Sequence, residues 1–176
     1  MYLKKISLEN FRCFEKVEVD LQKKLTLVVG ANGAGKTSLL ESIAIAMSTM
    51  FTAFDGAKAM NITKESAHLK AYKIGSTDNV QPQYPVRIGA WAQLDERPEI
   101  YWERTLNTAK GKTTIKDAKQ ILEVASDYQK RLQEGIPHYC CRSLLTMVQA
   151  DNGIIIVKSR RTFLKKIQER TVTLIV

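Results

Sequence analysis

Long apolar runs are missing from this 176-residue chain, and so are the patterns of a disulfide-bonded or zinc-binding protein. No stretch approaches the roughly 20 consecutive apolar residues that a membrane-spanning helix needs. The opening MYLKKISLEN does not show the basic-then-apolar order of a secretory signal. The three cysteines include an adjacent pair but no C-x-x-C, and the two histidines are far apart (Cys13, Cys140, Cys141, His68 and His138). These absences predict a soluble, cytoplasmic protein with no membrane partner.

The length of the chain allows one compact domain rather than two ordinary ones. A formal net charge of +9 suggests an acidic partner such as nucleic acid. The charge is uneven, however, because residues 138–176 carry seven basic and two acidic side chains, whereas the first 137 residues carry 20 and 16. A basic tail is more often a solvated end than a binding surface, so the charge alone does not establish a nucleic-acid interface.

Hydrophobic periodicity predicts three strands and a helix in the first third of the chain. Residues 2–9 and 17–21 alternate apolar and polar side chains, as half-buried strands do. Residues 25–29 (LTLVV) form an apolar run, which is typical of a strand buried on both faces. Residues 37–51 repeat apolar side chains at spacings of three and four, which indicates an amphipathic helix.

The pattern is weaker further along the chain. Residues 52–84 contain turn formers but no strong period. Residues 86–94 and 99–106 alternate as the strands of a hairpin or meander do. We expect Thr114 to cap a helix over residues 115–134.

The glycine-rich segment between the apolar strand and the first helix matches a phosphate-binding motif in full. Residues Gly30 to Thr37 read GANGAGKT, the pattern G-x-x-x-x-G-K-[ST]. Gly30, Gly33 and Gly35 let backbone N–H groups reach phosphate oxygens, and the helix directs the positive end of its dipole at the same anion. Lys36 is expected to reach the β- and γ-phosphates, and the Thr37 hydroxyl to hold Mg²⁺. The motif, in this strand-to-helix context, predicts nucleotide binding.

The residues around this motif narrow the class of nucleotide-binding protein. Residues 8–43 (LENFRCFEKVEVDLQKKLTLVVGANGAGKTSLLESI) resemble the N-terminal lobe of SMC and RecF-like ATPases, a family that includes the Rad-type repair ATPase heads. The resemblance rests on a first strand ending in Asn-Phe-Arg, on the strand pair that follows, and on the spelling of the loop. The residues that carry it are Asn10, Phe11, Arg12, Phe14, Asn32, Gly33 and the run Thr37-Ser38-Leu39-Leu40-Glu41.

This resemblance implies an α/β fold, a P-loop NTPase that is part of an ABC-type ATPase head, with a mixed β-sheet and a helix after the P-loop. It implies that Arg12 approaches the nucleotide's phosphates, that Asn32 lies at the γ-phosphate side, and that Ser38 contacts the α-phosphate region. ATP and Mg²⁺ are the implied ligands. In the intact protein, a second head would form a homodimer, and DNA would be a further partner. Cys13 is expected to be only a partly buried thiol.

The middle of the chain, residues 86–134, resembles a narrower group of bacterial AAA-type proteins from retron and Septu-like antiphage systems. In that group a strand pair with Trp, like Trp91 and Trp102, precedes a helix, an apolar strand and a Tyr-Tyr-Gly-Thr-Gly-Arg segment. The resemblance implies phage defence and a nuclease partner. Ordinary cross-strand packing of the two tryptophans is expected whatever the family.

The sequence does not supply the groups that hydrolysis requires. An ABC-type head needs an apolar strand ending in Asp-Glu (Walker B), where Asp holds Mg²⁺ and Glu activates water, and a signature motif from a second head. Four apolar residues followed by Asp-Glu occur nowhere. The nearest match, Leu94-Asp95-Glu96, is preceded by Gln93 and followed by Arg97-Pro98, which indicates a turn. We identify no catalytic residue, and expect the chain alone to bind ATP weakly and to hydrolyse it slowly or not at all.

The end of the chain departs from the family pattern, so we expect a head lobe over residues 1–137 and an atypical basic tail over 138–176. The missing Tyr-Tyr-Gly-Thr-Gly-Arg can be encoded in an alternative frame of the codons for Leu145 to Asp151, which suggests a frameshifted, truncated product. Such a tail would not have been selected to pack on the lobe. Its apolar runs Gly153–Lys158 and Thr171–Val176 have high β-propensity, and can add strands to an exposed sheet edge or promote aggregation.

Two other classes of function compete with the ATPase head. A small P-loop kinase or GTPase would need an acceptor site or the guanine-reading Asn-Lys-x-Asp, and no such tetrapeptide occurs. A non-enzymatic, basic nucleic-acid-binding module would depend mainly on the tail, so removing the residues after Pro137 would abolish its DNA binding.

The frameshift hypothesis makes a prediction about the gene. We expect its DNA to read Tyr-Tyr-Gly-Thr-Gly-Arg in the alternative frame across the codons of Leu145 to Asp151, with the shift between about Gly135 and Cys141. Sequencing the encoding DNA tests this directly, and codons there that disallow the alternative frame would eliminate the hypothesis.

Overall fold

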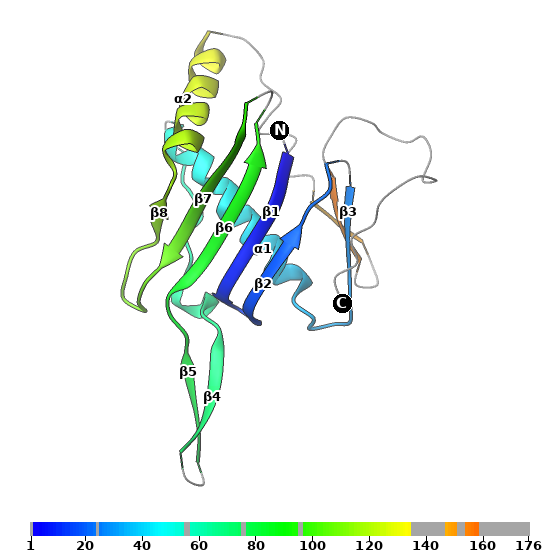
Figure 1. The fold of residues 1–176 in the computed structure, drawn as a ribbon, viewed down its shortest axis with the longest axis vertical. Coiled ribbons are helices and arrows are strands. Elements are labelled where there is room, and N and C mark those ends of the chain that lie inside the picture. Colours follow the sequence, from blue (N-terminus) through cyan, green and yellow to red (C-terminus); the bar gives the residue numbers. More distant parts are fainter. Residues whose placement is uncertain are drawn as a thin grey trace.

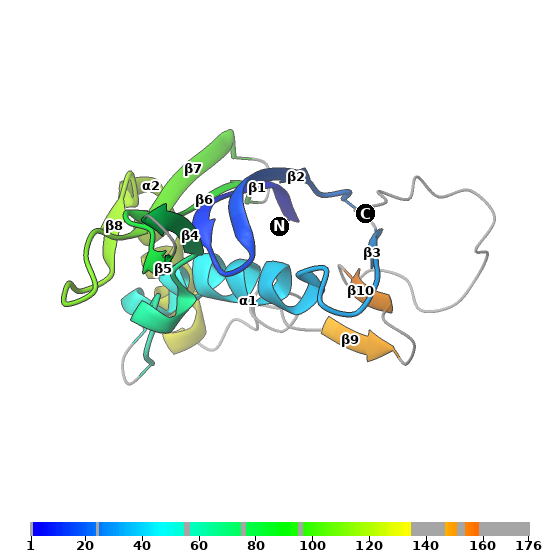
Figure 2. The same cartoon turned by 90° about the horizontal axis from the view of Figure 1, so that it is seen from below.

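A five-stranded antiparallel sheet is the largest element of this protein, and helices cover one of its faces (Figure 1, Figure 2). The computed structural model describes residues 2–23, 25–54, 57–74, 77–94, 97–134, 147–150 and 154–158. The strand order is β2-β1-β6-β7-β8, so that the first strand and a strand from the middle of the chain are neighbours. The strands are β1 (Tyr2–Phe11), β2 (Phe14–Asp20), β6 (Val86–Gln93), β7 (Glu99–Leu106) and β8 (Thr114–Lys116).

Alternation along the strands separates a buried face of this sheet from a more exposed one. On β1 and β6, Ile6 pairs with Ala90 and Leu8 pairs with Ile88, and all four side chains are almost completely buried. Burial of a side chain the size of Leu or Ile contributes about 1.5–3 kcal/mol. The two-residue period predicted for β1, β6 and β7 is therefore confirmed, and it fixes which face receives the helices.

Helix α1 (Lys36–Met47) lies across the buried face and continues into a short 3-10 helix, η1 (Ser48–Ala53). Helix α2 (Lys119–Gln133) packs beside it on β7 and η1. The predicted helix over residues 37–51 is thus confirmed, with a tighter final section. None of the helices in the described parts of the chain has the length and hydrophobicity needed to cross a bilayer.

Strand β7 holds the C-terminal end of α1. Trp102 donates from Nε1 to the carbonyl oxygen of Ala46 at 2.9 Å, which adds a side-chain donor to a carbonyl at the helix end that the N–H of Ser48 also contacts. The guanidinium of Arg104, 1% exposed, donates to the carbonyl of Met60 at 2.6 Å and approaches Thr49 Oγ1 at 3.5 Å. Burial lowers the pKa of Arg104. A cation next to the negative end of the helix dipole is favourably placed.

Strand β3 (Leu25–Val29) belongs to a separate three-stranded sheet. It pairs with β10 (Ile154–Lys158), which also pairs with β9 (Met147–Ala150). The prediction that Gly153–Lys158 can add a strand to a sheet edge is confirmed for Ile154–Lys158, whereas Thr171–Val176 lies outside the described residues. The expectation that β3 is buried on both faces is wrong, because only Thr26 and Val28 are buried. All the pairings among the described strands are antiparallel, so they include no parallel pair of a mixed sheet.

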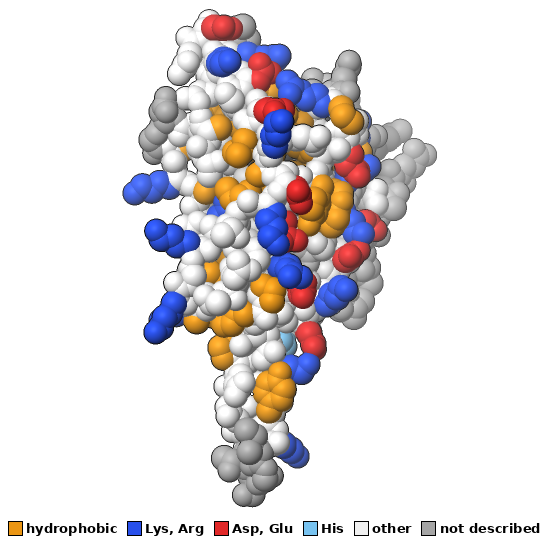
Figure 3. Space-filling view, turned by 60° about the vertical axis from the view of Figure 1, so that its left-hand side comes forward, with side chains coloured by type: hydrophobic (Ala, Val, Ile, Leu, Met, Phe, Trp, Pro, Cys, Tyr) orange, Lys and Arg blue, Asp and Glu red, His pale blue; other side chains and the backbone are white. Residues whose placement is uncertain are grey.

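A two-stranded arm projects from the body of the protein (Figure 1). It consists of β4 (Leu69–Ile74) and β5 (Thr77–Pro82), in the region where the sequence shows no strong period. The side chains of Leu69, Tyr72 and Val80 are exposed. Figure 3 shows apolar and charged side chains together along the arm. The base of the arm follows η2 (Lys64–Ser66) and is hydrogen-bonded to the β1–β2 turn.

The expected helix over residues 115–134 begins later than predicted, and Thr114 is not its cap. Thr114–Lys116 instead forms β8, which pairs with β7. The Thr114 hydroxyl donates to the carbonyl of Thr105 at 3.2 Å, and β-branched residues at this point favour an extended chain. Pairing with β7 therefore outweighs the local capping signal.

The two tryptophans of the chain lie on opposite faces of the same sheet, which allows a matched test of how α1 is held. Trp102 is buried under α1, whereas Trp91 is half-buried on the other face and packs on Tyr101 with ring centroids 4.6 Å apart. We predict that Trp102→Phe lowers the free energy of unfolding by about 1–3 kcal/mol, because the Ala46 carbonyl loses its side-chain donor and a smaller ring leaves the buried site incompletely filled. Trp91→Phe should change it by less than about 1 kcal/mol.

Urea unfolding followed by circular dichroism measures both changes. In each variant the remaining tryptophan reports its own environment by fluorescence. Equal losses in the two variants would contradict the role assigned to the bond from Trp102 to α1.

Candidate nucleotide-binding site

The glycine-rich loop joins β3 to α1 and contains two left-handed glycines. Strand β3 ends at Val29 and α1 begins at Lys36. Gly33 and Gly35 have φ angles of +85° and +91°, a region that other residues adopt only with strain. Gly35 is the N-cap residue of α1, and its carbonyl accepts a hydrogen bond from the N–H of Leu39 at 2.9 Å. The strand-loop-helix context that the motif requires is therefore confirmed.

These two glycines are needed for different reasons. A β-carbon added at Gly35 would lie 2.5 Å from Cys13 Sγ and 2.6 Å from Phe14 Cζ, so the missing side chain lets the β1–β2 turn pack against the loop. A β-carbon added at Gly33 would meet nothing within 4 Å. That side of the loop is open to an incoming group. The expectation that Cys13 is partly buried is wrong: the residue is exposed, with its sulfur close to Gly35.

The ammonium group of Lys36 lies over the loop that precedes it. Nζ donates to the carbonyl oxygens of Gly30 and Ala31, both at 2.7 Å. An ammonium group has three donors, so these two bonds leave one for another acceptor. The side chain thus fixes the start of the loop and places a positive charge beside it.

The N-terminal end of α1 has features that favour binding of a negatively charged group. It has no side-chain cap, and its first turn contains no acidic residue. Its first N–H groups have no intrahelical acceptor, and the helix dipole adds a partial positive charge at this end. Thr37 is exposed here and Ser38 is half-buried. Among the described residues no group of three or more His, Cys, Asp or Glu side chains could hold a metal ion, so a magnesium ion here would take ligands from Thr37, from phosphate oxygens and from water.

Arg12 occupies the β1–β2 turn, immediately before the two residues that contact Gly35. Its φ is +54°, which is uncommon for a residue other than glycine. Its Nη2 donates to Glu41 Oε1 of α1 at 2.6 Å. The turn therefore brings a second positive charge to the same end of α1.

Most of the residues that the sequence predicts for this site lie together in the structure. Seven of them belong to the loop and the first turn of α1: Gly30, Asn32, Gly33, Gly35, Lys36, Thr37 and Ser38. Arg12 reaches the same end of α1 from the β1–β2 turn, while Asn32 is exposed in the loop. Sequence reasoning assigned no role to Glu41, the partner of Arg12. The only sequence signal for Glu41 was its place at the end of the run Thr37–Glu41, which carries the family resemblance.

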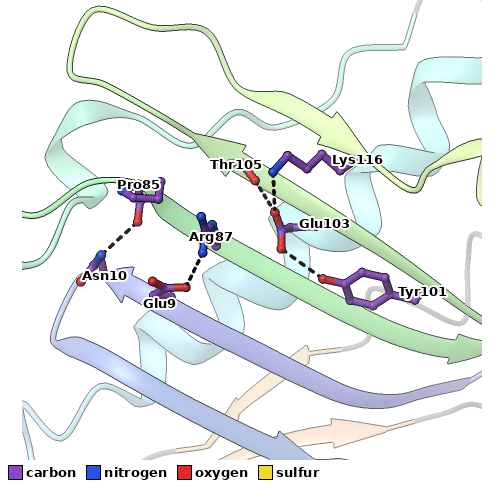
Figure 4. A network of polar contacts seen from close by, with 8 residues as sticks. All are labelled: Glu9, Asn10, Pro85, Arg87, Tyr101, Glu103, Thr105 and Lys116. Carbon is purple, nitrogen blue, oxygen red and sulfur yellow. Dashed lines mark hydrogen bonds and ion pairs between the residues drawn. The ribbon is translucent and has the colours of Figure 1, made fainter.

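A network of polar side chains lies on the face of the main sheet opposite α1, and it has no part in the loop (Figure 4). Glu9 pairs with Arg87 at 3.0 Å, and Glu103 accepts a hydrogen bond from Tyr101 at 3.1 Å and faces Lys116 at 3.7 Å. Burial, with the nearby Glu103 carboxylate, raises the pKa of Tyr101 to about 12, so the phenol stays neutral and acts as a donor. These groups are engaged with one another across neighbouring strands, which is the role of a cross-strand ladder.

Comparison with known proteins identifies the family of this chain. A family model described as an AAA domain matches residues 5–171, nearly the whole chain. The chain belongs to the AAA domain family. The match continues past residue 137, where the sequence suggested a boundary between a lobe and a tail.

This AAA-family chain is similar in sequence to curated proteins of DNA repair and of chromosome maintenance. It is 27% identical over 174 residues to the DNA replication and repair protein RecF of Streptococcus agalactiae serotype Ia, covering 94% of this chain and 45% of that protein. It is 46% identical over 43 residues to RecF of Clostridium acetobutylicum, covering 24% and 12%. It is 38% identical over 66 residues to structural maintenance of chromosomes protein 6 of Saccharomyces cerevisiae, covering 38% and 5%. The chain thus spans less than half the length of these relatives.

Among solved structures, the fold is similar to that of an Smc head bound to the C-winged helix domain of ScpA. The TM-score is 0.51 at 17% identity, and the match covers 72% of this chain and 41% of that one. The predicted α/β P-loop NTPase fold, part of an ABC-type head, is therefore confirmed. The resemblance to SMC heads is confirmed at the level of fold, and the resemblance to RecF at the level of sequence similarity.

The two left-handed glycines give a matched test of the packing between turn and loop. We predict that Gly33→Ala costs about 1–3 kcal/mol of stability through backbone strain alone. Gly35→Ala should cost more, because strain is added to overlap with Cys13 and Phe14. Urea midpoints measured for both variants check the order, and a larger loss in Gly33→Ala would contradict it.

Proposed function

We propose that this chain is the nucleotide-binding N-terminal lobe of an SMC/RecF-like ATPase head, and that its loop binds ATP with Mg²⁺. The observation that carries the proposal is the N-terminal end of α1, which has neither a side-chain cap nor an acidic first turn and follows a loop that opens at Gly33. Such an end stabilises a polyphosphate through backbone N–H groups and the helix dipole. Lys36 adds a side-chain cation at the same point.

In this proposal each predicted residue acts on a different part of the nucleotide. The N–H groups of the loop glycines surround the phosphates, Lys36 binds the β- and γ-phosphates, and Thr37 holds Mg²⁺. Asn32 lies at the γ-phosphate side, and Ser38 contacts the α-phosphate region. Arg12 supplies a further phosphate contact from the β1–β2 turn. ATP supplies the charge that this end of α1 lacks.

ATP binding would serve the assembly of a larger machine. In the intact protein, we propose, ATP joins two heads and its hydrolysis releases them, with DNA or a nuclease partner responding to the change. The similarity to proteins named for DNA repair and chromosome maintenance supports a role in DNA transactions. The resemblance of residues 86–134 to the retron and Septu-like group supports the narrower role in phage defence. The sequence contains no Walker B motif, so this chain alone should hydrolyse ATP slowly or not at all.

We further propose that the lobe comprises residues 1–137, and that residues 138–176 are an atypical, out-of-frame segment. The absence of a Tyr-Tyr-Gly-Thr-Gly-Arg segment from residues 138–176 supports this division, whereas the AAA domain match through residue 171 counts against it. The backbone pairing of β10 with β3 is compatible with it, because strand pairing depends on main-chain hydrogen bonds more than on particular side chains.

Removing the ammonium group of Lys36 tests the proposed function. We predict that Lys36→Ala weakens binding of Mg-ATP by about ten- to a hundredfold, the effect of losing one charge-assisted hydrogen bond. Isothermal titration calorimetry or a fluorescent ATP analogue measures the dissociation constant.

The matched control is Lys58→Ala, which removes an exposed lysine outside the loop and should leave affinity unchanged. Thermal melting establishes that both variants are folded. Equal affinity of the wild type and Lys36→Ala would overturn the assignment of the loop.

A further inference from the structure

We propose that Glu41 and His68 are positioning residues that hold Arg12 in a fixed place beside the phosphate loop. The inference deepens the proposed function and rests on it, because it concerns the same nucleotide site. Glu41 comes from α1, and His68 from the base of the β4–β5 arm. Neither side chain need touch the nucleotide, since each acts through Arg12.

The backbone of Arg12 is held at both of its polar groups. Its N–H donates to the carbonyl oxygen of Ser66 at 2.7 Å. Its carbonyl oxygen lies 2.8 Å from Nδ1 of His68, and because a carbonyl can only accept, that ring nitrogen carries the proton. The N–H of His68 in turn donates to the carbonyl of Asn10 at 2.9 Å, which ties the arm to β1.

These bonds explain how Arg12 keeps a strained backbone. A φ of +54° disfavours a side chain with a β-carbon, and such residues persist where the surrounding structure imposes the conformation. Strained residues of this kind occur disproportionately at functional sites. The strain therefore points to a need for the Arg12 side chain at this point of the turn.

The guanidinium of Arg12 is held as well. Its Nη2 donates to Glu41 Oε1 at 2.6 Å, with the two side chains 38% and 30% exposed. Glu41 lies five residues after Lys36, which places it about 7.5 Å further along the helix. Five N–H donors are available on a guanidinium, so a bond to Glu41 leaves others for a phosphate oxygen.

The turn that carries Arg12 is also fixed relative to the loop. The next two residues, Cys13 and Phe14, occupy the space that a side chain at Gly35 would need. Movement of the turn would therefore disturb the loop itself. Arg12 is fixed by its backbone, by its guanidinium and by the residues that follow it.

This arrangement distinguishes Glu41 from an ordinary surface ion pair, which contributes little because both side chains are mobile. An arginine that is already in place loses less conformational freedom when it binds an anion. Loss of Glu41 should accordingly weaken nucleotide binding, although it removes a negative charge from the neighbourhood of a negative ligand. If only the charge of Glu41 mattered, its loss would instead strengthen nucleotide binding.

The test compares variants of Glu41 in the full chain by their dissociation constants for Mg-ATP. We predict that Glu41→Ala weakens binding by about five- to tenfold, the effect of losing one ordinary hydrogen bond, because Glu41 acts on the nucleotide only through Arg12. Glu41→Gln should keep affinity within about threefold of the wild type, because its amide oxygen still accepts from Arg12.

A double-mutant cycle separates positioning from a general structural effect. Arg12→Ala should weaken binding at least as much as Glu41→Ala, and the double variant should bind no more weakly than Arg12→Ala alone. The proposal would be overturned if the fold-losses of the two single variants multiplied in the double variant. It would also be overturned if Glu41→Ala bound Mg-ATP more tightly than the wild type or equally well. If Lys36→Ala weakens binding as predicted in that case, the proposed function stands and only the role of Glu41 fails.

Two controls match the variants. Asp127→Ala removes a carboxylate of similar exposure, which pairs with Arg97 at 3.0 Å and with Arg131 at 3.3 Å, and should not change affinity. On the arm, His68→Ala should weaken binding, whereas Lys70→Ala, which breaks the arm's pair with Glu15, should not. Equal effects of the two arm variants would remove His68 from the proposal.

Discussion

The missing side chain at Gly35 is the constraint on which the arrangement of this protein depends. Because Gly35 has no β-carbon, Cys13 and Phe14 can press against the loop, and the β1–β2 turn meets the start of α1 directly. The other end of α1 is held by Trp102, which donates to Ala46 from the adjoining sheet. The helix is thus fixed to the same sheet near both of its ends. These two contacts of α1 with the sheet also fix the position of the loop.

Strand β3 depends on a different part of the chain. Its backbone pairs with Ile154–Lys158, and the pairing extends to Val29, the last residue before the loop. Main-chain pairing is largely independent of side-chain identity, so an apolar run of high β-propensity is sufficient to provide it. The C-terminal region therefore supports one side of the loop, whatever its origin, while the main sheet supports the other through Gly35.

The parts that sequence reasoning predicted correctly are those specified by local pattern. Alternation identified β1, β2, β6 and β7, and the glycines with Lys36 identified the loop and the start of α1. The arm was missed because alternation signals burial of one face, whereas Leu69 and Val80 are exposed. Thr114 was misassigned because pairing with β7, distant in sequence, outweighed a local cap signal. The contact between Arg12 and Glu41 joins two elements across 29 positions, and no local pattern specifies it.

The charges around α1 follow the direction of its dipole. At the C-terminal end, Arg104 is buried against Met60 and Asn61, and among the described residues no carboxylate forms an ion pair with it. A buried cation without a counter-ion is costly unless other groups stabilise it, and carbonyl oxygens together with the negative end of a helix do so. At the N-terminal end the reverse charge is missing, since the first turn contains no acid and no capping side chain. Lys36 and Arg12 increase the positive potential there, and Glu41 offsets only part of it. A polyphosphate bound in the loop would therefore supply the negative charge that this end of the helix lacks, just as Arg104 supplies the positive charge at the other.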